Sequence, residues 1–267
     1  MPPIIPVTDP EDPRVAPYLA VRERDVAGRQ GRFIAEGEVV LRVLARSPLV
    51  RARSLLIAEG RLARLAPLIE QFSDDTPVYG AGQAVMDAVV GFHIHRGVLA
   101  FGERLAEPSA EALLAGLGPR TRVAALFGVS NHDNVGGIFR NAAAFGADAV
   151  LLDGACCDPL YRKAIRVSVG AALAVPFARL APGEDAIALF ERHGLTALAL
   201  SPTGETPLAA LIPPPRAAIL LGAEGPGLPP AILSRVRTIA IPMTGAFDSL
   251  NVATTSGIVL HHLAFGR

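Results

Sequence analysis

The second half of the chain repeats one pattern: a continuous apolar run, a glycine-rich turn, and a stretch with helical spacing. The clearest apolar runs lie at residues 123–129, 195–201, 217–225 and 239–243. A strand that is apolar on both sides is typical of a parallel sheet whose two faces are covered by helices. The pattern therefore predicts an α/β fold with a mostly parallel sheet. In such sheets, ligands bind beyond the carboxyl ends of the strands.

The first half shows a smaller α/β pattern. Residues 32–47 have helical spacing after a short strand-like start, residues 53–60 form a compact apolar run, and residues 89–103 alternate short β-rich runs with glycine. Residues 107–121 mix helix formers with glycine and proline, which favours a junction. We therefore expect an N-terminal domain at 1–106 with an irregular N-terminal extension, a linker at 107–121, and a C-terminal domain at 122–267.

Charge is balanced overall but unevenly distributed. The 267 residues contain 25 Lys and Arg against 25 Asp and Glu, which excludes a uniformly basic protein, and 51% hydrophobic residues exclude a disordered one. Between Arg14 and Arg64, however, the sequence contains eleven arginines and only five acidic residues, which gives this segment a net charge of +6. Arginine suits bidentate phosphate contacts. This segment is either a polyanion-binding face or a reflection of codon bias.

Membrane and metal functions find little support in the sequence. It contains no apolar run of about 20 residues and no secretory leader pattern, so we expect a cytoplasmic protein without a membrane span. Three short pairs of candidate metal ligands occur: Cys156/Cys157, His93/His95 and His261/His262. None has the spacing of a metal site. We therefore expect no metal, and we interpret the cysteines as small buried apolar residues.

Three turns after expected strands combine glycine with polar side chains. In the first, at 131–146, Gly136 and Gly137 permit close backbone approach at a helix start, and Arg140 lies near enough to the strand ends to point into a cleft. Three polar residues there could cap the helix: Asn131, Asp133 and Asn134. The turn lacks both common nucleotide-binding glycine patterns.

The other two turns lie at 220–230 and 239–257. In the former, three glycines surround Glu224, which is either an exposed turn acid or a residue that fixes a neighbouring loop. Three glycines in six residues suggest a ligand close to the backbone. In the latter, Ser249 or Asp248 could cap a helix that starts near Leu250, and Asn251 offers both an amide donor and an acceptor.

Together the three turns resemble the signature motifs of the SpoU (TrmH) family of RNA 2′-O-ribose methyltransferases, in the SPOUT superfamily. The resemblance covers about Ala124 to Leu263. The matching residues are Asn134, Gly136, Arg140, Ala142, Phe145 and Gly146; Gly222, Glu224, Gly225 and Gly227; and Ile241 to Met243, Gly245 and Ser249 to Ala253. The first half, at 32–44, resembles the small L30e-like substrate-binding domain that many members carry. Three sites depart from the commonest family pattern: His132, Asp133 and Asn141.

The resemblance implies a fold, a cofactor and an assembly. The C-terminal SPOUT-type parallel sheet would end in a deep trefoil knot, S-adenosylmethionine would bind in a bent form among the knotted loops, and the protein would form a homodimer through the catalytic domain, with sites near the interface. The residues that correspond to cofactor contacts are Leu221, Gly222, Gly227, Ile241, Met243 and Leu250.

The resemblance also implies catalytic roles. Arg140 corresponds to the family's catalytic arginine, proposed to activate the ribose 2′-hydroxyl. Because a guanidinium has a pKa above about 12, we expect it to stabilise a developing 2′-alkoxide rather than act as a base. The site would be completed by Asn134, Glu224, Ser249 and Asn251. We expect Asn251 to orient the ribose and Glu224 to position Arg140 or a loop.

RNA contacts are expected from Arg32 and from a basic helix that contains Arg162, Lys163, Arg166 and Ser168. Solvated helix charge is the alternative for that helix. The extra N-terminal domain favours ribosomal RNA over tRNA as substrate. Two other functions stay open: a catalytically inactive knotted RNA-binding scaffold or assembly factor, and an α/β enzyme that binds another nucleotide.

Overall fold

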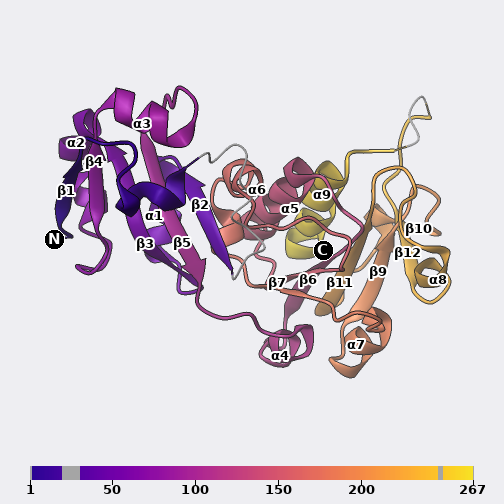
Figure 1. Cartoon of the computed structure of the whole chain (residues 1–267). Helices are drawn as coiled ribbons and strands as arrows, with labels where there is room; N and C mark the ends of the chain where they lie inside the picture. The colour runs from indigo at the N-terminus through magenta and orange to yellow at the C-terminus, as the bar shows by residue number, and fades with distance from the viewer. Residues whose placement is uncertain (1, 20–30, 246–248, 267) are drawn as a thin grey trace. The chain divides into compact units, whose positions relative to one another are not determined.

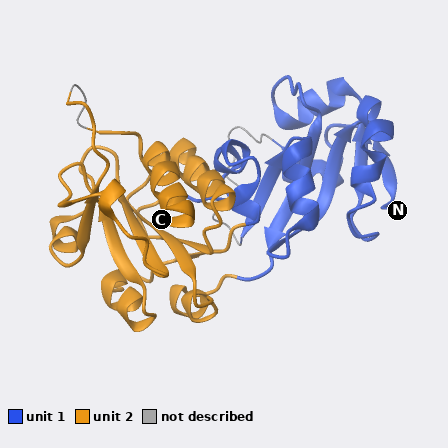
Figure 2. Cartoon of the chain, turned by 180° about the vertical axis from the view of Figure 1, so that it is seen from behind, with its two compact units in different colours: residues 1–106, 158–174 blue, residues 107–157, 175–267 orange. Residues whose placement is uncertain are grey.

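The computed structural model describes residues 2–19, 31–245 and 249–266. The chain forms two compact units, and one of them is discontinuous in sequence (Figure 2). Unit 1 contains Met1–Ala106 and Asp158–Ala174, and unit 2 contains Glu107–Cys157 and Val175–Arg267. The two units are described separately below.

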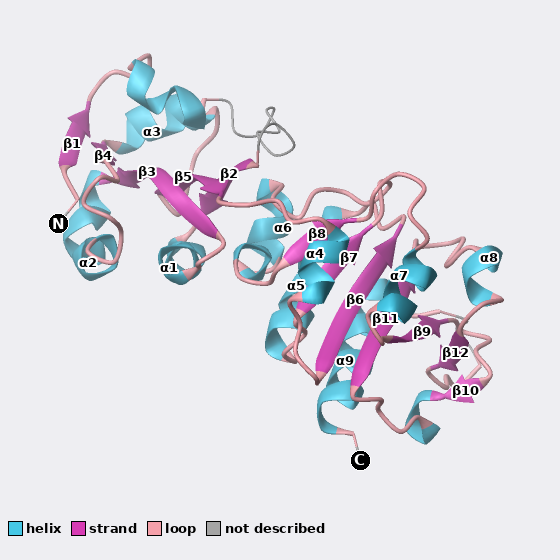
Figure 3. Ribbon diagram, turned by 90° about the horizontal axis from the view of Figure 1, so that it is seen from below, coloured by secondary structure: helices cyan, strands magenta, loops and turns pink. Residues whose placement is uncertain are grey.

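The described part of unit 1 forms a five-stranded sheet in the order β1-β4-β3-β5-β2. All strands run in one direction except β5, which is antiparallel to both of its neighbours. The helices α1 and α2 cover one face, and α3 covers the other with the short helix η1 (Figure 3). The bounds are β1 Ile4–Val7, η1 Pro13–Tyr18, β2 Arg32–Glu36, α1 Glu38–Arg46, β3 Val50–Ala58, α2 Glu59–Ile69, β4 Val78–Ala81, α3 Gln83–Val90, β5 Val98–Arg104, α6 Arg162–Val167 and η2 Ala171–Leu173.

Unit 2 is built on a seven-stranded sheet in the order β10-β12-β9-β11-β6-β7-β8, and every pairing in it is parallel (Figure 1). The apolar runs form its central strands, as expected. The bounds are α4 Ala110–Ala115, β6 Thr121–Phe127, α5 His132–Ala144, β7 Ala149–Leu152, β8 Phe177–Arg179, α7 Ala186–Arg192, β9 Thr196–Leu200, β10 Thr206–Pro207, η3 Leu208–Ala210, β11 Arg216–Gly222, α8 Pro230–Leu233, β12 Arg237–Ala240 and α9 Val252–Phe265.

Each face of this sheet has its own pair of helices. Alternate strand residues, among them Val123, Leu151 and Leu220, pack with α4 and α7 in one apolar cluster. On the other face α5 packs beside α9, so closely that a side chain on Gly137 would approach the Cβ of Ala253 to 2.7 Å. Two segments far apart in sequence thus form one helical layer.

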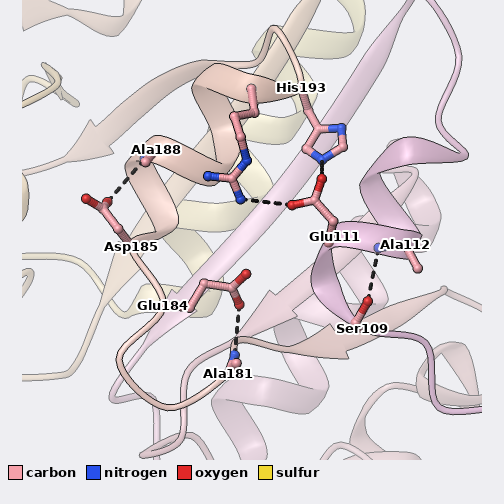
Figure 4. Close-up of polar contacts among 9 residues, drawn as sticks. Ser109, Glu111, Ala112, Ala181, Glu184, Asp185, Ala188 and His193 are labelled. Carbon is pink, nitrogen blue, oxygen red and sulfur yellow. Dashed lines mark hydrogen bonds and ion pairs between the residues drawn. The ribbon is translucent and has the colours of Figure 1, made fainter.

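The segment expected to be a linker contains α4, which belongs to unit 2. Ala110 and Leu114 of this helix are buried in the unit 2 core. Glu111 also binds α7 through Arg192 and the adjacent His193, at 2.8 and 2.7 Å (Figure 4). The glycines and prolines that suggested a linker therefore flank a short packed helix.

A second difference concerns residues 158–174, which were expected in the C-terminal domain but pack in unit 1. Arg162 of α6 forms a 3.0 Å ion pair with Glu36 on β2. Ser47, which follows α1, donates a hydrogen bond to the carbonyl of Leu173. Sequence order alone gives no sign of this placement, because the segment lies between β7 and β8 of the other unit.

No helix among the described residues is long and apolar enough to span a bilayer. Within the same residues no group of three His, Cys, Asp or Glu side chains is placed to hold a metal ion. Cys156 is buried, Cys157 is half-buried, and neither forms a disulfide with another described residue. Burial raises the pKa of the Cys156 thiol to about 12, so this residue packs as a small neutral group, as expected.

Candidate functional site

A cavity of about 440 Å³ opens in unit 2 beyond the carboxyl ends of β9, β11 and β12. It collects residues from the second and third glycine-containing turns and from the loop after β9. Its lining includes all six residues expected to contact a cofactor, namely Leu221, Gly222, Gly227, Ile241, Met243 and Leu250. Glu224, Ser249 and Asn251 also line it. The six expected cofactor residues and three of the five expected catalytic residues therefore share one cavity, whereas Asn134 and Arg140 do not line it.

The glycines of the second turn are explained in part by contacts within the chain. A Cβ on Gly222 would lie 2.3 Å from the carbonyl carbon of Gly227, so no side chain fits there. Gly225 and Gly227 have φ values of +84° and +69°, which favour glycine. The amide of Gly227 donates to the carbonyl of Ala223 at 3.0 Å and closes the turn. The turn is thus folded back on its own strand, and its backbone forms part of the cavity wall.

The third turn leads into α9, whose N-cap is Asn251. The Asn251 side-chain oxygen accepts from the amides of Ala253 and Thr254 at 2.9 and 3.2 Å. The helix therefore begins at Val252, and Ser249 is not its cap; Asp248 lies outside the described residues. In the first turn, one of the three candidates for the cap of α5 is confirmed, because the Asn131 side chain accepts from the amide of Asp133.

Asn251 also joins the three turns. Its side-chain nitrogen donates to Asn134 Oδ1 on α5 at 2.8 Å and to Glu224 Oε1 at 3.3 Å. Its oxygen caps α9, so both polar atoms of the Asn251 side chain are engaged within the chain. Glu224 is fixed by this contact to a neighbouring loop. We call Asn134, Glu224 and Asn251 the amide cluster.

The side-chain nitrogen of Asn134 is a buried donor that no acceptor in the described chain engages. Asn134 is 4% exposed, and its side-chain nitrogen is buried without a hydrogen-bond partner among the described residues. A buried donor of this kind carries a desolvation cost that an additional acceptor would offset. The first turn therefore retains an unused donor next to the residue that joins the three turns.

Arg140 has a different environment. It lies on α5, its side chain is exposed, and it does not line the cavity. It makes no ion pair or hydrogen bond within the part of the chain that the structure describes. A guanidinium in this position is available to a phosphate or an oxyanion from outside the chain.

The residues expected to contact RNA divide into two groups, all within unit 1. Arg162 is engaged by Glu36, and Ser168 is 1% exposed, donating to the carbonyl of Ile165 and accepting from Ala172. Ser168 is therefore not accessible to RNA in this structure, because its hydroxyl stabilises the end of α6. The exposed group consists of Arg32, Lys163 and Arg166.

The sequence prediction missed part of the cavity. Leu200, Ser201 and Pro202, at the end of β9, line it, as does Thr255 of α9. The available signal was position, because β9 was expected as a buried strand of the same sheet, and its carboxyl end had to lie at the same edge as that of β11. The segment that lines the cavity, Leu200 to Pro202, carries no charged residue that would have drawn attention to it.

Known proteins resemble the chain over nearly its whole length. The sequence model of the SpoU rRNA Methylase family matches residues 121–261. An uncharacterized tRNA/rRNA methyltransferase of Mycobacterium bovis is 41% identical over 266 residues, which cover 96% of this chain and 90% of the relative.

Solved structures agree with this fold. The crystal structure of an AdoMet-bound rRNA methyltransferase from Sinorhizobium meliloti superposes with a TM-score of 0.78 at 24% identity, covering 96% of each chain. That of an RNA 2′-O ribose methyltransferase superposes with a TM-score of 0.77 at 26% identity, covering 97% of this chain and 98% of the other. The expected resemblance is thus confirmed: the chain belongs to the SpoU rRNA Methylase family of RNA methyltransferases, whose cofactor is S-adenosylmethionine.

Proposed function

We propose that this protein transfers the methyl group of S-adenosylmethionine to a ribose 2′-hydroxyl in structured RNA, with ribosomal RNA favoured over tRNA. One observation carries the proposal: the six residues expected to bind the cofactor line a single cavity at the carboxyl edge of the unit 2 sheet. A solved structure with the same fold and 26% identity is of an RNA 2′-O ribose methyltransferase. The reaction would take place in the cytoplasm.

The cavity suits S-adenosylmethionine in size and chemistry. Its volume of about 440 Å³ lies within the usual range for small-molecule sites, roughly 300–1,000 Å³. Leu221, Ile241, Met243 and Leu250 offer apolar walls for an adenine ring, and the backbone of the Gly222 turn offers polar groups. The Glu224 carboxylate adds a negative charge to the lining for a cationic ligand. The bound cofactor supplies an activated methyl group on its sulfonium.

Arg140 would act on the RNA. Removal of the 2′-proton leaves charge on oxygen, and a guanidinium within reach stabilises it by charge-assisted hydrogen bonds. Because arginine stays protonated at neutral pH, the proton would pass to an RNA phosphate or to water. The exposed and unengaged side chain of Arg140 agrees with this role. Holding the 2′-oxygen in line with the methyl group would supply much of the rate.

The amide cluster would keep the catalytic loops in place. Asn251 fixes Glu224 at the cavity and Asn134 at the start of α5, the helix that carries Arg140. Asn134 and Asn251 therefore act as positioning residues. Ser249 lines the same cavity.

Two features of the family remain part of the proposal. The first is the deep trefoil knot: after β12, the chain returns to pack α9 on α5 and against β11 and β6, which is compatible with a threaded C-terminus. The second is a homodimer through unit 2. The outer face of α9 exposes Ile258 and Phe265, two large apolar side chains that a second copy could cover.

The test uses purified protein, S-adenosylmethionine labelled in its methyl group, and in vitro transcribed ribosomal RNA. Digestion to nucleosides should yield one labelled 2′-O-methylnucleoside. Arg140→Ala should abolish turnover while leaving thermal stability and calorimetric cofactor binding unchanged, since its exposed side chain makes no hydrogen bond or ion pair with the described residues. A labelled base would contradict ribose specificity. Cofactor binding without any transfer would favour a scaffold or assembly factor, and absence of cofactor binding would contradict the proposal as a whole.

A further inference from the structure

The helices α5 and α9 meet in unit 2 through residues that have almost no side chain (Figure 1). A Cβ on Gly137 of α5 would lie 2.7 Å from the Cβ of Ala253, and Gly257 follows one turn later on α9. Packed helices are held in register by side-chain ridges that fit into grooves of the partner, and glycine and alanine form only low ridges. The apolar part of this contact therefore brings the two backbones together but does little to stop one helix from sliding along the other.

Asn141 of α5 supplies a directional contact at the same place. Its side-chain nitrogen donates to the carbonyl of Ala253 at 2.7 Å and to the hydroxyl of Ser256 at 3.0 Å. Ser256 is 0% exposed and itself donates to the Ala253 carbonyl at 2.7 Å. A Cβ on Gly257 would lie 3.1 Å from the Asn141 nitrogen, so glycine there leaves room for the side chain. Asn141 is thus bonded to two groups within one turn of α9.

These hydrogen bonds fix the register of α5 against α9. A slip of one residue along an α-helix is a shift of about 1.5 Å and a rotation of about 100°. It would carry the Asn141 nitrogen away from the Ala253 carbonyl and take a partner from the buried hydroxyl of Ser256. Losing a partner inside the fold is costly for a polar group. A single polar side chain at a helix contact specifies register in the same way in coiled coils.

The Asn141 contact and the amide cluster together flank Arg140. On α5, Asn134 precedes Arg140 by six residues and accepts from Asn251 at 2.8 Å, and Asn141 follows Arg140 directly. On α9, Asn251 and Thr255 line the cavity. Two separate bonds from α5 to the cavity end of α9 fix both the rotation and the axial position of the segment that carries Arg140.

We propose that Asn141 is a positioning residue for methyl transfer, which sets the register of α5 against α9 and thereby the place of the Arg140 guanidinium relative to the cavity. This inference rests on the proposed function. A misplacement of reacting groups by about 1 Å can slow a reaction about 10²-fold, so a register contact next to Arg140 acts on the rate rather than on binding. It also gives a role to Asn141, one of the three departures from the commonest family pattern.

The experiment compares two Asn141 variants with a matched control on the same helix. Asn141→Ala removes the donor and favours the helix, since alanine is the best helix former. Asn141→Asp keeps the size of the side chain but has no donor, and it serves if the alanine variant fails to fold. Ile138→Val is the control, because it removes one carbon from a side chain that is 0% exposed and leaves the Asn141 contacts in place.

Methyl transfer is measured under single-turnover conditions, with enzyme and S-adenosylmethionine in excess over in vitro transcribed 16S and 23S ribosomal RNA. Multiple-turnover kinetics give KM for the RNA, isothermal titration calorimetry gives the cofactor Kd, and urea unfolding gives the stability of each variant. We expect Asn141→Ala and Asn141→Asp to lower the single-turnover rate about tenfold or more, with KM and Kd changed less than about twofold. Ile138→Val should lower the stability but keep the rate within about twofold of the wild type.

A double-mutant cycle tests whether Asn141 acts through Arg140. Arg140→Lys keeps a positive charge without the guanidinium. In that background Asn141→Ala should slow methyl transfer by less than about threefold, because the group that it positions is already missing. A slowing equal to that in the wild-type background would show that Asn141 acts by another route and would overturn the inference.

The inference would also be overturned if the Asn141 variants transferred methyl at the wild-type rate, if their loss appeared in KM or Kd instead, or if Ile138→Val slowed transfer as much. When the wild type methylates ribose, each of these results removes only the role of Asn141 and leaves the proposed function standing. A wild type that methylates no ribose overturns the proposed function, and the role of Asn141 with it, before any variant is compared.

Discussion

Asn251 connects three segments of unit 2, and its replacement by alanine would remove two kinds of contact. The N-cap bonds to Ala253 and Thr254 would be lost, which costs about 1 kcal/mol. The buried oxygen of Asn134 would lose its donor, which costs about 1–3 kcal/mol. The bond to the more exposed Glu224 adds little. We therefore expect Asn251→Ala to lower the free energy of unfolding by about 2–4 kcal/mol.

Asn251→Asp separates the two effects. Aspartate is as good an N-cap as asparagine, and its charge suits a helix start. However, it replaces the donor with an oxygen that faces Asn134 Oδ1 and the Glu224 carboxylate. We expect this variant to lose only the second contribution, about 1–3 kcal/mol, and to bind S-adenosylmethionine more weakly because Glu224 is displaced from the cavity wall.

Urea unfolding gives the stability of both variants, and isothermal titration calorimetry gives their cofactor affinity. The reasoning would be refuted if Asn251→Ala lowered the free energy of unfolding by less than about 0.5 kcal/mol, the range of an ordinary surface substitution. It would also be refuted if Asn251→Asp equalled the wild type in both measurements. A change in the urea m-value would show that the comparison is not two-state.

Three further predictions concern other parts of the fold. Gly222→Ala should abolish cofactor binding and lower the melting temperature, because a Cβ would lie 2.3 Å from the Gly227 backbone; a melting curve like that of the wild type would contradict this. The pKa of Glu111 is lowered from its usual value near 4.5, chiefly by its hydrogen bond to Arg192, so Glu111 stabilises the fold above that pH and this stabilisation is lost as the pH falls through the pKa of the folded state. Glu111→Gln should therefore flatten the acid limb of a plot of unfolding free energy against pH, and an unchanged acid limb would exclude the effect. Arg162→Ala leaves a buried carboxylate unpaired and should destabilise unit 1 by about 2 kcal/mol or more in urea unfolding, whereas no loss would show that the pair is dispensable.

The central strands and the glycine turn that forms part of the cavity wall could be predicted from the sequence. Continuous apolar runs identify β6, β9 and β11, because a strand buried on both faces has no polar alternation. The glycine pattern around Gly222 and Gly227 is equally local, since close backbone approach leaves no choice of residue. Each of these features is determined within a few residues of the chain.

Features that depend on contacts between distant segments could not be predicted. The packing of α6 in unit 1 requires Glu36 and Arg162, which are 126 residues apart, to meet. The cap of α9 was placed two or three residues too early because Ser249 and Asp248 are as suitable as Asn251 by composition; the partners Asn134 and Glu224 favour Asn251. The exposure of Arg140 was equally invisible, since its environment depends on how α5 packs.

The most direct test of the central claim is a transcriptome-wide map of ribose 2′-O-methylation in cells that lack this gene. Cells complemented with the wild type and with Arg140→Ala serve for comparison. The account predicts that one or a few ribose positions, in ribosomal RNA, lose methylation in the deletion strain and regain it only with the wild-type gene. An unchanged map, a change confined to base methylation, or full rescue by Arg140→Ala would contradict it.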